Sequence, residues 1–201
     1  QPDCPYPYKE LSGCGIGFKL VQALAERGCS GGPDPYSFLD LVAISIAADI
    51  VPVTGENRVL AYLGLAQLNR QPRPGLKAIL DLNNIRRKLD ISDVVFIIAP
   101  RINAAGRIKD ARHAIDLLLA DTAESSEAGG QRINLLNTER RALDVAITEE
   151  ALQQLRGDDK AETRKTTVVH SAGWHKGVVG IVASRLIEHY YRPTVVLSGA
   201  D

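Results

Sequence analysis

The segment TTVVHSAGWHKGVVGIVASRLIEHYYRPTVVL, residues 166–197, decides the fold class of this chain. Its pattern predicts a strand over residues 166–170, a helix over 176–191 and a second strand over 193–197. A strand, a helix and a strand in this order form one α/β unit. The fold class expected for this part of the chain is therefore α/β.

The chain before this unit is predicted to be mostly helical. A long, half-exposed helix is expected over residues 131–155, because apolar positions recur there every three, four or seven residues among charged ones. Further helices are expected at 15–28, 35–49, 56–68, 75–82 and 110–119, with a short strand at 94–99 and a surface loop at 100–107. The sequence therefore predicts an α-rich part (1–128), a connecting helix (129–157) and the start of a smaller α/β domain (158–201).

Composition indicates an ordinary globular protein and names no partner. The 201 residues include 24 Lys or Arg and 24 Asp or Glu, so the formal net charge is zero. The charges are unevenly spread, since residues 56–112 carry a net charge of +6 and residues 113–165 a net charge of −4. One segment is therefore locally basic.

Cysteine usage and hydropathy predict a cytoplasmic location. Cys4, Cys14 and Cys29 are odd in number and form no Cys-x-x-Cys pair, which argues against a disulfide framework or a zinc site. No apolar run is long enough to cross a bilayer, and no secretory signal opens the chain. A chain that begins with Gln1 and contains no methionine is expected to be an internal fragment of a longer protein.

A carboxylate at the end of an apolar helix is the first candidate site residue. Asp49 closes the predicted helix at 35–49, where burial would be costly unless the carboxylate met a cation or hydrogen-bond donors. A divalent metal is one such cation. An exposed carboxylate, or one paired with an arginine, is the other interpretation, and a single aspartate cannot hold a metal alone.

Two further stretches are candidates for binding an anion. Arg101, Asn103 and Arg107 lie among small or apolar neighbours and could grip a phosphate, although Asp93 or Asp110 could instead pair with the arginines. The turn at 171–180 joins a strand to a helix, where Trp174 could stack on a base and His175 and Lys176 could donate hydrogen bonds. The alternative is that Trp174 fills the core and that the glycines of this turn permit close packing.

Several blocks, taken together, resemble the RecJ branch of the DHH phosphoesterases, which are single-strand-specific 5′-to-3′ DNA exonucleases. The matching blocks are CPYPYKEL (4–11), GIGFKL (15–20), DLVA (40–43), ADIVP (48–52), TGENR (54–58), APRINAAGR (99–107), NTERR (137–141) and WHKGVVGIVASRL (174–186). The resemblance spans nearly the whole chain and is weakest between about 61 and 92 and between 120 and 132.

The resemblance implies a metal-dependent nuclease of DNA repair and recombination. It implies the C-terminal part of a DHH catalytic domain, a connecting helix and the start of a DHHA1-type domain, with a two-metal Mn²⁺ or Mg²⁺ centre and single-stranded DNA as partner. Asp49 matches a metal-binding aspartate of the family. Stretches that face the substrate cleft of the family match Arg101, Asn103, Arg107, Trp174, His175, Lys176, Ser184 and Arg185. A groove bordered by both Asp49 and the arginines after Pro100 is expected.

The departures from the family pattern limit what this chain is expected to do. The Asp-His-His triplet of the family is absent, so the 201 residues alone are not expected to hydrolyse DNA. Two alternatives stay open: a related phosphodiesterase acting on short oligonucleotides or cyclic dinucleotides, and a non-catalytic nucleic-acid-binding module. The sequence does not indicate which protein partners the chain has.

Overall fold

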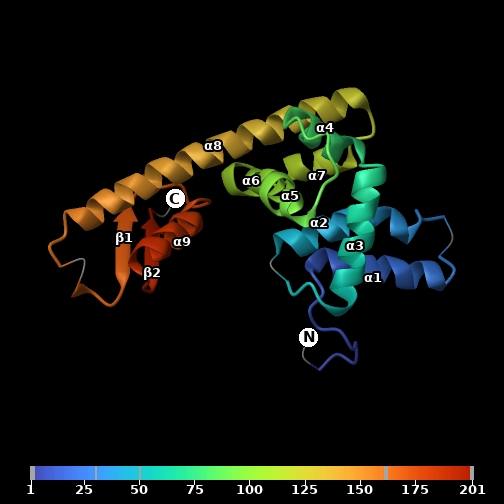
Figure 1. The fold of residues 1–201 in the computed structure, drawn as a ribbon, viewed down its shortest axis with the longest axis horizontal. Coiled ribbons are helices and arrows are strands. Elements are labelled where there is room, and N and C mark those ends of the chain that lie inside the picture. Colours follow the sequence, from blue (N-terminus) through green and yellow to red (C-terminus); the bar gives the residue numbers. More distant parts are fainter. Residues whose placement is uncertain (1–2, 30, 50, 161–162, 200–201) are drawn as a thin grey trace. The chain divides into compact units, whose positions relative to one another are not determined.

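The computed structural model describes residues 3–29, 31–49, 51–160 and 163–199, which divide into two compact units. The first unit comprises residues 1–102 and 115–131, and the second comprises 103–114 and 132–201. The elements, shown in Figure 1, are α1 (Gly13–Glu26), the 3₁₀-helix η1 (Pro35–Phe38), α2 (Leu39–Ala48), α3 (Gly55–Arg70), α4 (Pro74–Leu82), α5 (Ile91–Asp93), the π-helix η2 (Val94–Ile98), α6 (Ala99–Ile108), α7 (Arg112–Leu119), α8 (Ala123–Arg156), β1 (Thr167–Ser171), α9 (Val179–Tyr190) and β2 (Thr194–Ser198).

Helix α2 is the centre of the first unit. It is apolar on nearly all sides, as predicted, and it packs against α1 and α3. Gly64 of α3 makes the closest approach, because a Cβ atom there would lie 2.1 Å from the carbonyl oxygen of Leu39. The helices expected from the sequence in this region are all present, with ends shifted by a few residues.

A continuous helical segment replaces the strand and the loop that were expected over residues 94–107. The capping box of Asp90 and Asp93 starts a helix at Ile91. The π-helical turn η2 then leads directly into α6, so both predictions were wrong. Pro100 sits at the start of α6, where its missing N–H is tolerated because the preceding π-turn already interrupts the regular hydrogen-bond ladder.

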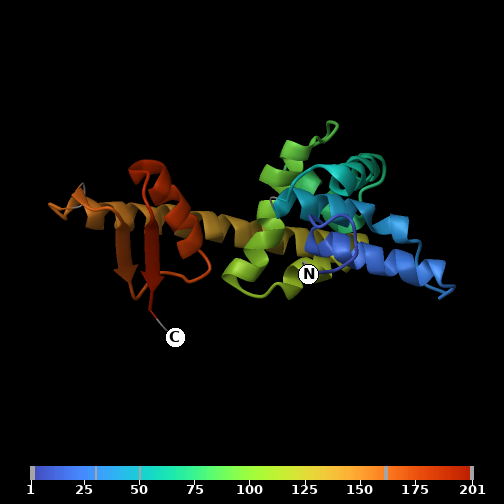
Figure 2. The same cartoon turned by 90° about the horizontal axis from the view of Figure 1, so that it is seen from below.

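The second unit contains the predicted α/β element. Strands β1 and β2 pair in parallel, with Thr167 opposite Thr194 and Ser171 opposite Ser198, and α9 connects them (Figure 2). This confirms the α/β class. The connecting helix α8 is longer than expected, since it begins at Ala123 rather than near residue 130.

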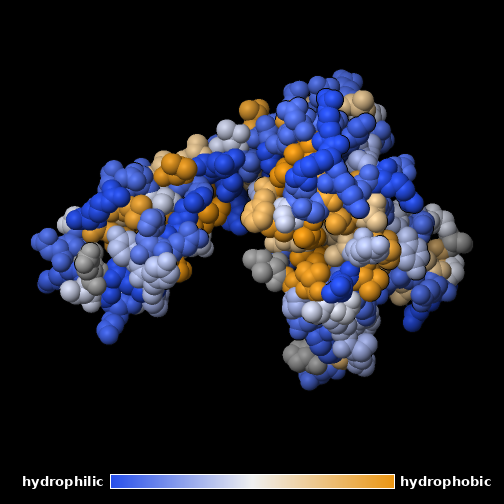
Figure 3. Space-filling model, in the orientation of Figure 1, coloured by the Kyte–Doolittle hydropathy of each residue, from blue (hydrophilic) through white to orange (hydrophobic). Residues whose placement is uncertain are grey.

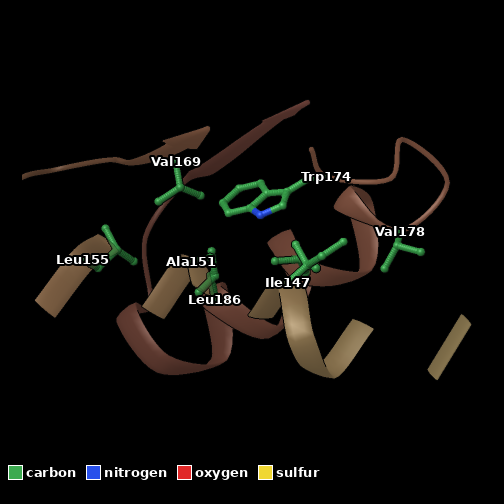
Figure 4. Close-up of a cluster of buried hydrophobic side chains, with 8 residues drawn as sticks. Ile147, Ala151, Leu155, Val169, Trp174, Val178 and Leu186 are labelled. Atoms are coloured by element: carbon green, nitrogen blue, oxygen red, sulfur yellow. The ribbon is translucent and has the colours of Figure 1, made fainter. Parts of the chain in front are cut away.

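One apolar core joins α8, α9 and β1 in this unit. Figure 4 shows side chains from all three elements and from the turn before α9 around the Trp174 ring. The buried members are Ile147, Ala151, Leu155, Val169, Trp174, Val178, Val182 and Leu186. These contacts fix the turn at 171–180 against the long helix.

Apolar side chains also remain on the surface of the first unit, where Figure 3 shows them gathered on the face in view. On α1, Ile16, Leu20 and Leu24 follow one another at intervals of four residues and are between 45 and 62% exposed. Even so, in the part of the chain that the structure describes, no helix combines the length and the apolar character needed to cross a membrane.

Candidate nucleic-acid interface

Asp49 lies exposed at the C-terminal end of α2. Its backbone N–H donates the last i→i−4 hydrogen bond of the helix to the carbonyl oxygen of Ser45, and the Ser45 hydroxyl donates to Asp49 Oδ2 over 2.9 Å. Among the described residues the carboxylate is thus exposed and not paired with an arginine, and its role as a metal ligand stays a prediction. An exposed carboxylate with a single hydroxyl partner keeps lone pairs that could coordinate a metal ion.

The surroundings of Asp49 supply no complete metal site. Among residues 3–29, 31–49, 51–160 and 163–199, no three His, Cys, Asp or Glu side chains come together as a metal would require. The thiol of Cys14 is protonated, because burial raises its pKa and the charges of Asp40 and Asp49 raise it further. Asp49 therefore fits a divalent ion as one ligand only.

Arg101 is held inside the first unit by its own helix and by α4. Its Nη1 donates to the Ile97 carbonyl oxygen over 2.7 Å, and its Nη2 donates to Asn83 Oδ1. The aspartates that the sequence offered as partners are engaged elsewhere. Asp93 pairs with Arg87 at 2.6 Å, which lowers the pKa of Asp93, and Asp110 accepts a hydrogen bond from the backbone N–H of Arg112.

Asn103 and Arg107 lie exposed on the last turns of α6, within the second unit. Arg107 Nη1 donates to the Gly177 carbonyl oxygen over 3.3 Å. The backbones meet here as well, because a Cβ atom on Gly177 would lie 1.9 Å from the Arg107 carbonyl oxygen. Gly177 thus permits α6 to contact the turn before α9, a contact that the sequence did not predict. Since Asp49 and Arg101 belong to the other unit, the shared groove stays a prediction.

The turn before α9 buries its aromatic ring. Trp174 is 4% exposed, and its Nε1 donates to Glu150 Oε2 over 2.7 Å, so the ring fills the core and presents no free face to a base. The proposed stacking role is therefore corrected in favour of the alternative (Figure 4). His175 Nδ1 accepts a hydrogen bond from the Gly177 N–H, which leaves the neutral ring's proton on Nε2, while the Lys176 side chain is exposed.

Helix α9 presents Ser184 and Arg185 on its outer side. The Ser184 hydroxyl donates to the Gly180 carbonyl oxygen. Arg185 binds the buried carboxylate of Asp144 through two hydrogen bonds, Nε to Oδ1 at 2.8 Å and Nη2 to Oδ2 at 2.7 Å. This bidentate pair raises the pKa of Arg185 and fixes the plane of its guanidinium group.

Comparison with known proteins matches almost all of the chain to one group. It is 42% identical over 202 residues to the single-stranded-DNA-specific exonuclease RecJ of Bacillus subtilis, and 34% identical over 215 residues to the RecJ of Escherichia coli, with 98% of the chain aligned in each case. The crystal structure of RecJ from Thermus thermophilus in complex with Mn²⁺ superposes with a TM-score of 0.85 at 35% identity, over 96% of the chain. Nearly the whole chain is thus similar to part of these RecJ exonucleases.

The chain covers a minor share of each RecJ relative. It spans 24% of the B. subtilis protein, 37% of the E. coli protein and 28% of the Thermus structure. No protein-family model matches it. The fold described above is thus similar to part of the RecJ fold.

Arg140 of α8 is a residue that the sequence did not assign to the candidate site. It lies next to Asp144, and its Nη2 donates to Asn137 Oδ1 over 3.2 Å. Burial lowers the pKa of its guanidinium group, and the positive charges of Arg141, Arg107 and Arg185 lower it further, against the opposite effect of Asp144. The block NTERR pointed to this place but gave no role to any of its residues.

Proposed function

We propose that this chain is a segment of a single-strand-specific DNA exonuclease that hydrolyses phosphodiester bonds with the help of divalent metal ions. The observation that carries the proposal is the alignment of nearly the whole chain with proteins named as RecJ exonucleases. The proposed substrate is single-stranded DNA. The 201 residues contribute substrate contacts and one metal ligand, and alone they do not cut DNA.

The proposed metal is Mn²⁺ or Mg²⁺, the ions named for two structures of the Thermus relative. Asp49 would hold it together with ligands outside the described residues. When bound, such an ion activates a water molecule and offsets the charge that builds up on the scissile phosphate. Because the Asp49 carboxylate is exposed and its printed contact is one hydrogen bond accepted from the Ser45 hydroxyl, its remaining lone pairs can coordinate the ion without breaking that contact.

The arginines of α6 are proposed to position the DNA strand. Arg101 and Arg107 would form charge-assisted hydrogen bonds with phosphate oxygens, while Asn103 would donate or accept beside them. Their neighbours Ala104 and Ala105 are buried and anchor the helix. His175, Lys176, Ser184 and Arg185 are proposed to contact the same strand.

The remaining family features complete the proposal. Residues 1–128 correspond to the later part of a DHH catalytic domain, 129–157 to the connecting helix and 158–201 to the beginning of a DHHA1-type domain. The proposed setting is DNA repair and recombination in the cytoplasm. The order of helices followed by a parallel strand pair on one long helix supports this assignment.

A segment exchange tests the proposed function. The 202-residue segment of B. subtilis RecJ that aligns with this chain is replaced by the chain, and degradation of single-stranded DNA is followed in Mn²⁺. We expect degradation of single strands and not of duplexes. A chimera that folds, as judged by circular dichroism, and binds single strands without cutting them would favour the non-catalytic module instead.

Removing the α6 arginines is expected to weaken binding and flatten its salt dependence. Each phosphate contact contributes about 0.7 to the slope of log affinity against log salt concentration for single strands. In the chimera, Arg101→Ala and Arg107→Ala should each lower the slope by about that amount, as measured by fluorescence anisotropy with a labelled oligonucleotide. Arg156→Ala, which removes an exposed arginine paired with Glu149, is the control and should leave the slope unchanged. Unaltered slopes in both α6 variants would remove these arginines from the substrate path.

A further inference from the structure

Four arginines of the second unit, Arg107, Arg140, Arg141 and Arg185, form an arginine cluster with few acidic neighbours. They come from the end of α6, from α8 and from α9. Each of the other three acts electrostatically on Arg140. Among the described residues, the carboxylates that act on Arg140 and Arg185 are Asp144, which is 1% exposed, and Glu188, which acts on Arg185 alone. The cluster therefore keeps an excess of positive charge.

Within the cluster, Asp144 forms a closer ion pair with Arg185 than with Arg140. The carboxylate makes two hydrogen bonds of 2.7 and 2.8 Å to Arg185, whereas Nη1 of Arg140 lies 3.9 Å from Asp144 Oδ2. Arg140 has one hydrogen bond of 3.2 Å to Asn137, and its Nε is buried with no partner among the described residues. A guanidinium group has five N–H donors, so most of those on Arg140 lack a strong acceptor.

This arrangement costs free energy unless an anion completes it. A cation that is removed from water must regain its interactions from partners of opposite charge. The side chain of Arg140 is only 14% exposed, and its nearest charged neighbours other than Asp144 repel it. A ligand with two or three negatively charged oxygens would satisfy these donors and neutralise the excess charge.

Arg185 supplies the accessible half of such a site. Its side chain is 48% exposed, and Asp144 accepts hydrogen bonds from Nε and one N–H of Nη2. The two N–H groups of Nη1 and the second one of Nη2 therefore stay oriented away from the carboxylate. Bidentate binding to a buried carboxylate fixes their direction, which suits recognition of a phosphate group by a second fork.

We propose that Arg140 and Arg185 bind one phosphate group, with Asp144 and Asn137 as the positioning residues that orient them. The site lies in the second unit alone and needs no metal. That the phosphate belongs to the backbone of a single DNA strand rests on the proposed function. The site itself rests on the charges, distances and unpartnered donor described above.

The test uses the 201-residue chain without metal. Its thermal unfolding midpoint is measured in sodium phosphate and in sodium chloride at matched ionic strength and pH. We expect phosphate to raise the midpoint of the wild-type chain above its value in chloride, because a ligand that binds only the folded state stabilises it. Equal midpoints in the two salts would overturn the proposal.

Variants assign the effect to the cluster. Arg140→Gln and Arg185→Gln should each weaken phosphate affinity by about tenfold, the loss of roughly one charge-assisted hydrogen bond. Arg140→Lys keeps the charge and should lose less. Arg156→Gln is the control. Arg156 lies on the same helix as Arg140, about 24 Å from it along the helix axis, and the variant should behave as wild type. If phosphate raises the unfolding midpoint of Arg140→Gln and of Arg185→Gln as much as that of the wild-type chain, the assignment is wrong.

A second ligand separates this site from the proposed function. An oligothymidylate is titrated with the same variants, and its binding is measured by fluorescence anisotropy. If the phosphate effect depends on Arg140 but oligothymidylate binding does not, the site is real and takes a free phosphate, and the DNA assignment is wrong. If oligothymidylate binds and phosphate has no effect on the wild-type chain, the proposed function stands and the site does not.

Discussion

Asp49→Asn in the chimeric RecJ is expected to slow the degradation of single-stranded DNA by about 100-fold or more. A metal ion contributes several kcal/mol of transition-state stabilisation, and each 1.4 kcal/mol corresponds to a factor of about ten in rate. Asparagine keeps the size of the side chain and can still accept the Ser45 hydrogen bond, but it lacks the charge that a hard cation prefers. The rate is measured at saturating DNA over a series of Mn²⁺ concentrations.

The control for this prediction is Asp116→Asn, which removes a carboxylate that is exposed on α7. It should leave the rate and its Mn²⁺ dependence unchanged. Binding of single strands by Asp49→Asn should also persist, since the proposed phosphate contacts come from arginines. A variant that is as active as wild type at every Mn²⁺ concentration would show that Asp49 is no metal ligand.

Asp40→Ala is expected to reduce the free energy of unfolding by about 3 kcal/mol, although Asp40 lies on the same helix as Asp49. Asp40 is 1% exposed and binds Arg73 through two hydrogen bonds of 2.7 Å. Removing one partner of a buried ion pair costs about 3–5 kcal/mol, and the lower end applies because Arg73 keeps 20% exposure and a bond to the Ser37 carbonyl oxygen. Urea unfolding of the 201-residue chain measures the loss.

The double variant Asp40→Leu, Arg73→Leu tests the cause of this loss. If the uncompensated Arg73 charge is responsible, replacing both partners by apolar side chains should recover most of the stability. Asp49→Asn should leave unfolding within about 0.5 kcal/mol of wild type, as expected for an exposed position. If the double variant loses as much free energy of unfolding as Asp40→Ala, the cause is the packing around Asp40 and not its charge.

The elements that the sequence predicted well are those with strong periodicity or clear turn residues. The strand-helix-strand unit and the long helix α8 carry such patterns, and both are present. The run at 94–99 is short and wholly apolar, so its period cannot distinguish a strand from a buried helical turn. The stretch 100–107 shows no period, and the π-turn that accommodates Pro100 in a helix has no signature in a single sequence.

Candidate site residues could be named from the sequence, but their contacts could not. Arg185 was found through the family block, but its partner Asp144 lies 41 residues earlier on another helix. Arg101 likewise binds Asn83, 18 residues away. The burial of Trp174 depends on packing against α8, which no local pattern encodes. Partners that only the tertiary fold brings together were therefore the ones missed.

The π-helical turn at Val94–Ile98 determines the direction in which Arg101 leaves its helix. A π-turn accommodates one residue more than an α-turn, and each residue of an α-helix turns the chain by about 100°. Deleting one residue there would restore regular winding and swing the Arg101 side chain around the axis by that angle. The direction of the Arg101 side chain is thus set by the number of residues in this turn and not by the identity of its neighbours.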